Sequence, residues 1–169
     1  DWKDSRNPLL RGQPIKLKQY EDSRSLAIAV DAKHFVLGTS WDLRSFDAQG
    51  KQLWEKATTG SAWGVNLVAK DRLLIAALGD GTLRWLRMSD GRELLAAFIH
   101  AKDRRWIAWT PKGYYTSSDK GDDLIGWHQN RGWGRVAEFA FAHERRDQFR
   151  RPDIVKAAIE MLDEDRAIA

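Results

Sequence analysis

The side chains suited to metal binding or acid–base catalysis are scattered along this sequence rather than clustered. The four histidines are His34, His100, His128 and His143. None lies at ligand spacing from another, no HExxH-like cluster occurs, and the lack of cysteine excludes a thiolate ligand or nucleophile. Asp119, Asp122 and Asp123 gather in one predicted turn, yet they lack the spacing and the closing Glu of a calcium loop. We therefore expect no catalytic residue, no metal and no cofactor, and we predict that the chain is not an enzyme.

Aromatic and arginine side chains are the stronger candidates, and the chemistry they offer is binding. The nine tryptophans are Trp2, Trp41, Trp54, Trp63, Trp85, Trp106, Trp109, Trp127 and Trp133. Most lie in predicted strands, where large rings are expected to fill the core, although a ring on an outer face could stack on a ligand. Alternation in one strand sends Trp106 and Trp109 to opposite faces, so core packing is favoured for Trp109 and is left open for Trp106.

The candidate binding residues combine these rings with polar groups near the predicted strand ends. They are Trp41, Trp106, Trp109, Asp119, Trp127, His128, Arg145, Arg146 and Arg150. A structural role at a strand corner is the alternative for His128, and a solvated turn is the alternative for Asp119. The arginine run over 145–151 could simply be the solvated lead-in to a helix. It could also dock against an acidic surface, on a neighbouring domain or on a nucleic-acid backbone.

Glycine turns recur along the chain and indicate how these residues are positioned. Gly12, Gly50, Gly91 and Gly132 are 38, 41 and 41 residues apart. Asp80-Gly81 supplies the positive φ of a tight hairpin turn, and the following strand Thr82–Arg87 alternates between two faces. A period of about 40 residues, built from short strands and glycine turns, is typical of β-propeller blades.

The repeats predict about three four-stranded blades. The first repeat, about 25–58, has strands at Leu26–Val30, His34–Thr39, Leu43–Asp47 and Gln52–Lys56. The second, about 62–100, has strands at Trp63–Ala69, Leu73–Leu78, Thr82–Arg87 and Glu93–Ile99. The third, about 105–142, has strands at Trp106–Thr110, Tyr114–Ser117, Leu124–Gln129 and Val136–Ala142.

Different patterns flank the repeats. Residues 1–13 are expected to form an irregular lead-in, and the blades then occupy 14–143, beginning with one edge strand over Pro14–Gln19. Residues 144–169 form a basic linker and an amphipathic helix that begins at Pro152 and ends near Asp165. The length of 169 residues suits one domain.

Composition narrows the cellular setting of the chain. No apolar run approaches the ~20 residues of a membrane span, and the lack of cysteine fits a cytoplasmic protein. The net charge of +4 arises from 28 basic residues spread among 24 acidic ones, which favours a solubilising surface over a nucleic-acid footprint. Because the chain begins at Asp1 without Met, we expect it to be a fragment or a processed piece.

Two groups of motifs resemble a known family. Leu43-Arg44-Ser45-Phe46-Asp47 before Gly50, and Thr82–Arg87 before Gly91, are similar to the strand-and-turn consensus of WD repeats, although the Gly-His pair of that family is missing. Across most of the chain, Ala62–Asn66, Trp106–Tyr115, Leu124–Gly132 and Phe149–Asp153 resemble the final blades of bacterial WD-repeat proteins. Many of those proteins also carry a caspase-like protease domain. The resemblance implies an all-β, WD-repeat-like propeller portion of about three blades with one leading strand and a C-terminal α-helix.

The function predicted from this resemblance is a non-enzymatic scaffold that binds protein, as a sensing or regulatory module for an attached caspase-like effector. The alternative is a tryptophan-rich, lectin-like repeat that binds carbohydrate or another small ligand. Propellers close with four to eight blades, so three blades would leave two apolar sheet faces bare. We therefore expect a partner: a second copy that closes a ring, the remainder of a parent polypeptide, or a helix that covers one face. A membrane and nucleic acid are not expected partners.

Overall fold

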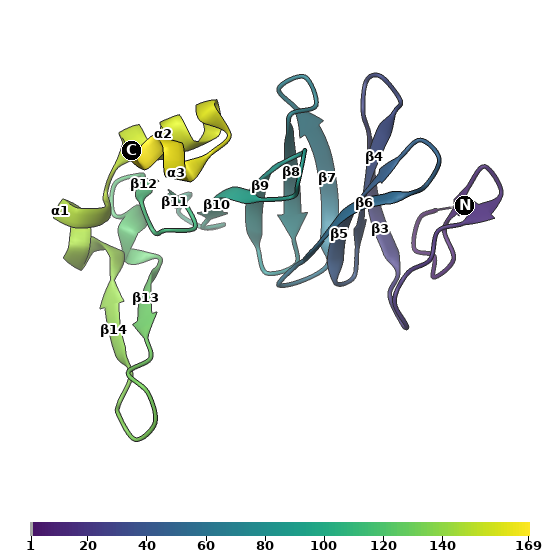
Figure 1. The fold of residues 1–169 in the computed structure, drawn as a ribbon. Helices are drawn as coiled ribbons and strands as arrows, with labels where there is room; N and C mark the ends of the chain where they lie inside the picture. The colour runs from purple at the N-terminus through teal and green to yellow at the C-terminus, as the bar shows by residue number, and fades with distance from the viewer. Residues whose placement is uncertain (1) are drawn as a thin grey trace. The chain divides into compact units, whose positions relative to one another are not determined.

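The computed structural model describes residues 2–169, which form two compact units with their boundary between Glu93 and Leu94. The chain is mostly β, with antiparallel sheets and short helices at its C-terminal end, so the predicted all-β class with a C-terminal helix is confirmed. Figure 1 shows the order of the elements along the chain.

The first sheet of the N-terminal unit is a four-stranded antiparallel meander. It consists of β3 (Ser23–Ile28), β4 (His34–Thr39), β5 (Asp42–Asp47) and β6 (Gln52–Ala57), in sequence order. The turn between β5 and β6 has Gly50 at φ 85°, while the Asp47 carboxylate accepts the backbone N–H of Lys51 at 2.9 Å. These four strands lie where the first repeat was predicted. β3 begins earlier than expected, at Ser23, and leaves Val30 exposed.

Three more strands of this unit pack on the first sheet. β7 (Ala62–Val68), β8 (Leu73–Leu78) and β9 (Thr82–Arg87) are antiparallel, and β7 lies against β3 and β4. The predicted Asp80-Gly81 turn joins β8 to β9, with Gly81 at φ 84°. The approach of β7 is close, because a Cβ on Gly38 would lie 2.9 Å from Ala62 Cβ. The core that these strands share consists of Val36, Leu43, Ala62, Leu74, Ala76, Leu78 and Leu86.

The segment before β3 differs from the prediction. The expected edge strand over Pro14–Gln19 is wrong: only Pro14 is in a strand, β2 (Gln13–Pro14), which pairs with β1 (Leu9–Leu10) inside the predicted lead-in. Ile15 and Leu17 instead pack against Phe35 and the rest of a second cluster on the first sheet. Two apolar side chains spaced by two residues can therefore cover a sheet face without joining the hydrogen-bonded ladder.

A network of charged side chains, here called the Arg44 network, is buried beside the same segment. Arg44 is 4% exposed, and its Nη2 lies 2.6 Å from Glu21 Oε2 and 3.2 Å from Asp42 Oδ2. Its Nη1 lies 3.1 Å from Glu55 Oε2. Lys18 Nζ completes the network at 2.8 Å from Asp42 Oδ2 and 2.5 Å from Glu55 Oε1. The Gly-His pair of WD repeats is missing from this sequence, and the Arg44 network supplies buried polar contacts in this sheet.

The C-terminal unit contains two separate antiparallel sheets. β10 (Glu93–Ile99), which starts at the unit boundary, pairs with β11 (Trp106–Trp109), and β11 pairs with β12 (Tyr115–Ser117). β13 (Gly126–Gln129) and β14 (Glu138–Phe141) pair only with each other within residues 2–169. All four strands of the third predicted repeat are present, but they do not form one sheet. The 3₁₀ helix η1 (Gly121–Asp123) follows β12. The edge of β12 is taken by residues 150–151 instead of β13, because Arg150 forms a bridge with Tyr115 and Arg151 N–H donates to Tyr115 O at 3.0 Å.

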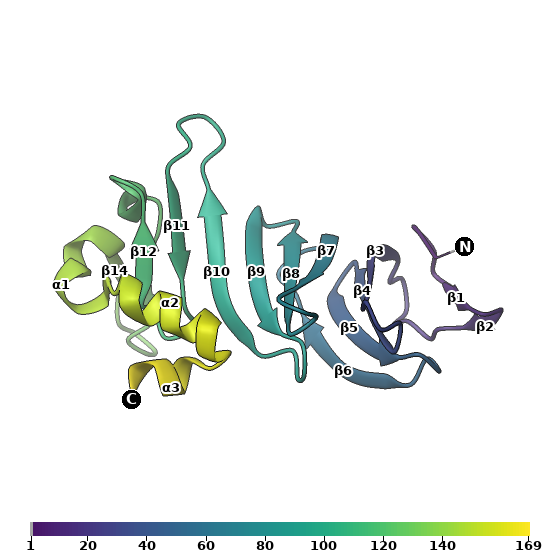
Figure 2. The same cartoon turned by 90° about the horizontal axis from the view of Figure 1, so that it is seen from above.

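Short helices complete this unit. η2 (Ala142–Arg145) and α1 (Arg146–Phe149) precede α2 (Pro152–Met161) and α3 (Glu164–Ile168). α2 begins at Pro152 as predicted, but it ends at Met161 because Leu162 adopts φ 54° and Asp163 caps α3. α2 lies against β12 (Figure 2), and its Ile154 is buried. None of the helices in residues 2–169 is long and apolar enough to cross a membrane.

Candidate interaction surface on the β13–β14 hairpin

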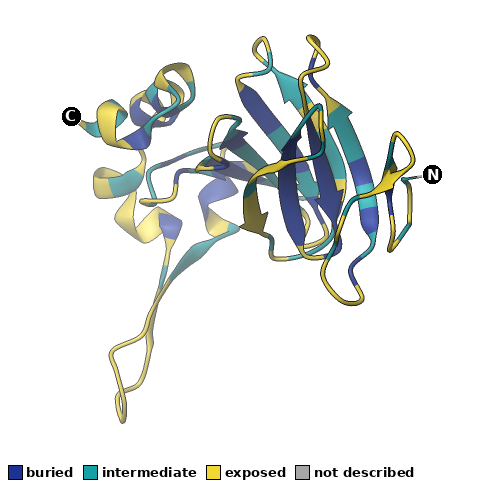
Figure 3. Cartoon of the chain, turned by 45° about the vertical axis from the view of Figure 1, so that its right-hand side comes forward, coloured by how far each residue is buried: buried dark blue, intermediate teal, exposed yellow. Residues whose placement is uncertain are grey.

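The hairpin of β13 and β14 exposes more large apolar side chains than a two-stranded sheet can shield. Its loop contains Trp133 between Gly132 (φ 94°) and Gly134 (φ 74°), and that indole is fully exposed, at 104%. Val136, on the same loop, is also exposed. Figure 3 shows the hairpin and its loop as mostly exposed or half-buried. Isolated two-stranded hairpins are marginally stable in water. The exposed apolar residues on this one therefore make it a candidate interaction surface.

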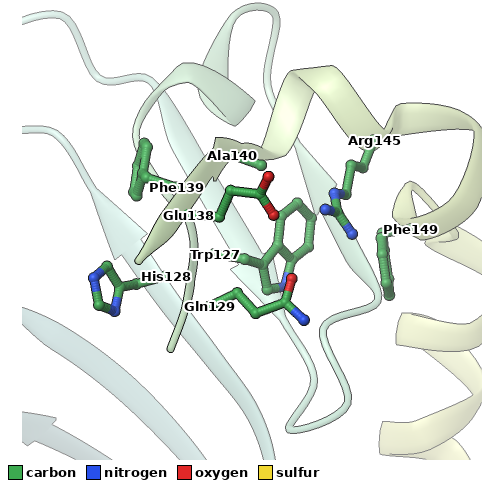
Figure 4. Close-up of a pocket in the computed structure, with 8 residues that line it drawn as sticks. All are labelled: Trp127, His128, Gln129, Glu138, Phe139, Ala140, Arg145 and Phe149. Carbon is green, nitrogen blue, oxygen red and sulfur yellow. The ribbon is translucent and has the colours of Figure 1, made fainter. Parts of the chain in front are cut away.

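A pocket with an aromatic floor lies beside the hairpin. Trp127 and Ala140 are paired in register, and the Trp127 ring lies 4.7 Å from the Phe149 ring, centroid to centroid. Both rings also pack on the buried cluster that contains Ile107 and Tyr115, which fixes their orientation. The pocket has a volume of about 440 Å³ and is lined by Trp127, His128, Gln129, Glu138, Phe139, Ala140, Arg145 and Phe149 (Figure 4).

One face of the hairpin carries a row of exposed rings. Phe139 and Phe141 are 54% and 43% exposed, and their rings meet edge to face with centroids 4.9 Å apart. The Phe141 ring in turn stacks on His143 at 5.4 Å. His128 lies opposite Phe139 in the register and belongs to the same face. We call Phe139, Phe141, His143 and His128 the aromatic row.

Ion pairs fix the base of this surface. The buried Asp122 carboxylate accepts two hydrogen bonds from Arg146, with Nε–Oδ2 at 2.5 Å and Nη2–Oδ1 at 2.8 Å. The bond from Arg146 lowers the pKa of Asp122 and raises the pKa of Arg146, whereas burial raises the pKa of Tyr115. The Tyr115 hydroxyl donates to Ala142 O at 3.0 Å, which ties β12 to the segment after β14.

The predicted binding residues fall into three groups in the structure. Trp127, His128 and Arg145 meet at the pocket, while Arg146 is adjacent but committed to Asp122. Trp106, Asp119 and Arg150 are exposed in the same unit and do not line the pocket. Trp109 is half-buried against the core, as favoured, and Trp41 is 53% exposed in the N-terminal unit. The nine tryptophans do not fill the core as fully as expected, because four are exposed and the described remainder are half-buried.

The residues that the sequence analysis missed are Phe139, Phe141, Phe149, Gln129 and Glu138. The two phenylalanines at i and i+2 inside a predicted strand were the available signal, because both had to lie on one face. Phe149 gave no such signal, since its contact with Trp127 joins a helix to a strand. No group of three or more His, Cys, Asp or Glu side chains that could hold a metal occurs within residues 2–169.

Comparisons with known proteins add little to this geometry. No family model and no curated protein matches the sequence. Among solved structures, the crystal structure of BamB from Moraxella catarrhalis is similar with a TM-score of 0.42 and 16% sequence identity. That match covers 57% of this chain and 34% of the BamB chain, so the chain spans about a third of the structure it matches. A likeness of this size supports no conclusion about function.

Proposed function

We propose that the chain is a non-enzymatic protein-interaction module that binds its partner through the β13–β14 hairpin. The observation that carries the proposal is the aromatic row, in which Phe139 and Phe141 are about half exposed on an otherwise regular strand. Aromatic residues and arginine are the residue types enriched in the buried centres of protein interfaces. The hairpin combines both, with Trp133 and Arg145 beside the row.

Within this proposal the sheets are WD-repeat-like propeller blades that act as a scaffold in the cytoplasm. The four-stranded meander of β3–β6 and the sequence repeat support the blade assignment. The resemblance to bacterial WD-repeat proteins supports a sensing or regulatory role for an attached caspase-like effector. A copy of the chain or the rest of a parent polypeptide would then complete the propeller, and light scattering across a range of protein concentrations measures the first of these.

Selection from a displayed random peptide library tests the interaction function against an unbiased set of candidate partners. The bait is the full chain, and the matched control is the double variant Phe139→Ser/Phe141→Ser, checked for folding by circular dichroism. We expect enriched peptides to bind the wild type at least about tenfold more tightly than the double variant, because the replaced rings supply the apolar contact. Enrichment of no peptide, or of peptides that bind both proteins equally, would contradict the proposal.

A second candidate function is the binding of a carbohydrate or another small ligand in the Trp127 pocket. The observation that favours it is a flat indole floor edged by the polar groups of Gln129, Glu138 and Arg145. Aromatic platforms with polar edges suit ligands that have one apolar face. Titration with mono- and disaccharides should quench tryptophan fluorescence in the wild type and leave Trp127→Ala unchanged. A flat titration in both proteins would leave protein binding as the function of this surface.

A further inference from the structure

We propose that the partner is an extended peptide segment of alternating acidic and apolar residues, which adds as a third strand to the outer edge of β14. This inference rests on the proposed function and specifies the chemistry of the partner. Three independent features of the hairpin support it: the open backbone edge, the different chemistry of the two faces, and the charge of the surface.

The backbone edge of β14 is open at Phe139. Ala142 N–H donates to Ile125 O at 3.0 Å, and every second pair of an antiparallel ladder is hydrogen-bonded. Trp127 and Ala140 therefore form a hydrogen-bonded pair, whereas Phe139 turns its N–H and C=O outward. At Phe141 the outward N–H is already taken by Glu144 Oε2 at 2.7 Å. An added strand would thus bond beside Phe139 and stop near Phe141.

The two faces of β14 dictate an alternating sequence in that strand. Successive side chains of a strand point to opposite faces. Every second residue of the added segment would meet the Phe139 and Phe141 rings, which favours apolar side chains there. The intervening residues would lie on the face that holds the Trp127 pocket and Arg145. Arg145 has no ion-pair partner among the described residues. A carboxylate of the added strand on this face would therefore form an ion pair with Arg145.

The charge of the surface favours an acidic partner over a second copy of the chain. Residues 126–151 contain six arginines and three acidic residues. Glu138 on the pocket face is already paired with Arg131. A second copy would bring the same excess of arginine to the contact, and like charges across an interface are strongly unfavourable. Nucleic acid is less well matched, because Arg131, Arg146 and Arg151 are engaged with carboxylates and the edge presents backbone groups.

The test compares short synthetic peptides by fluorescence anisotropy with the full chain. One peptide alternates Glu with Val and Phe, a second replaces each Glu by Lys, and a third carries N-methyl groups on the backbone amides of the first. We expect the Glu peptide to bind, and the Lys and N-methylated peptides to bind at least about tenfold more weakly. Arg145→Glu should weaken the Glu peptide by about tenfold. Lys102→Glu, an equal charge change on an exposed loop of the same unit, should leave it within about twofold.

Each other outcome overturns the inference in a distinguishable way. Equal binding of the Glu and Lys peptides, or no effect of N-methylation, would show that charge or edge pairing is not used. If a single-stranded oligonucleotide bound through Arg145 and Phe139→Ser had no effect on that binding, the partner would be a polyanion and not an acidic peptide. If the library selection yields only basic or helical peptides, this inference fails while the protein-interaction function stands. If the selection yields none, both fail.

Discussion

In the first sheet Arg44 lies among three carboxylates, whereas Arg145, in η2 after the hairpin, lines a pocket that contains no carboxylate paired with it. Arg44 is 4% exposed and contacts Glu21, Asp42 and Glu55. Arg145 is exposed, and Glu138 across the pocket is taken by Arg131. An arginine is thus fully paired with carboxylates in one unit, whereas an arginine in the other unit has no carboxylate partner and is available to bind one.

The difference shows where this chain can bind without losing stability. Removing a charge from water is costly and is offset only when hydrogen-bonded partners surround it, so a closed network such as that of Arg44 has no capacity for a ligand. An open arginine on an aromatic surface has lost little solvation and can still gain a partner. Arg84, at the position in β9 that corresponds to Arg44 in β5, is intermediate: its side chain is 18% exposed and contacts Asp80 and Glu93.

The largest expected effect is on the Arg44 network. Arg44→Met leaves the fully buried Glu21 without its arginine partner and leaves Asp42, 1% exposed, with Lys18 alone. We expect the free energy of unfolding to fall by about 3–5 kcal/mol, the usual cost of removing one partner of a buried ion pair. Urea denaturation followed by circular dichroism measures it.

Arg84→Met is the matched control for that variant. It should cost no more than about 1 kcal/mol, because the Asp80 and Glu93 side chains keep roughly a quarter of their exposure and remain solvated. Equal losses in the free energy of unfolding of the two variants would mean that burial of the carboxylates does not distinguish Arg44 from Arg84.

Asp122→Asn is expected to have the next largest effect, in the C-terminal unit. It neutralises the carboxylate, leaves a single amide oxygen to accept from Arg146 and turns an amide N–H₂ group toward that cation. The free energy of unfolding should therefore fall, by less than in Arg44→Met. Because the folded pKa of Asp122 lies below its ordinary value of 3.8, its contribution is present above pH 3.8 and is lost as the pH falls through the lowered value. Below pH 3.8, the free energy of unfolding should therefore fall less steeply with decreasing pH in Asp122→Asn than in the wild type. Urea denaturation at a series of acidic pH values measures this.

Much of this fold could be predicted from the sequence, since alternation and glycine turns define strands locally. β4, β8, β9 and β10 have the predicted bounds because each is bordered by turn residues with suitable φ. The strand predicted over Pro14–Gln19 failed, because the same alternation also suits a segment that covers a sheet. The single four-stranded third blade failed because Arg150 and Arg151 take the edge of β12 at Tyr115, a long-range contact that local patterns do not encode.

The candidate site was predicted in part. Trp127, His128 and Arg145 were candidates by residue type and position, and the structure brings them together at the pocket. Their grouping depends on Phe149 reaching Trp127 and on the pairing of β13 with β14, both of which are tertiary facts. The Arg44 network could not be foreseen either, because Glu21 lies 23 residues before Arg44 in a segment without regular structure.

A smaller effect is expected from Lys18→Met, which opens the solvent side of the Arg44 network. Lys18 is about half exposed, so its bonds to Asp42 and Glu55 should contribute at most about 1 kcal/mol and weaken in high salt. The bond to Asp42 raises the pKa of Lys18, so this contribution is complete below pH 10.5 and is lost at higher pH. Unfolding curves at neutral and alkaline pH check it, and a loss as large as that of Arg44→Met would place the critical charge on Lys18.

The smallest effect on stability is expected from Arg145→Glu, although it should abolish most of the peptide binding. Arg145 has no carboxylate partner among residues 2–169, so reversal of its charge should change the free energy of unfolding by less than about 0.5 kcal/mol. The neighbouring Arg146→Glu is the control, because it places a carboxylate against the buried Asp122 and should destabilise the unit clearly more. Thermal unfolding of both variants decides the matter. If Arg145→Glu proved the more destabilising of the two, Arg145 would be a structural residue. It would then not be available to bind the carboxylate of a partner.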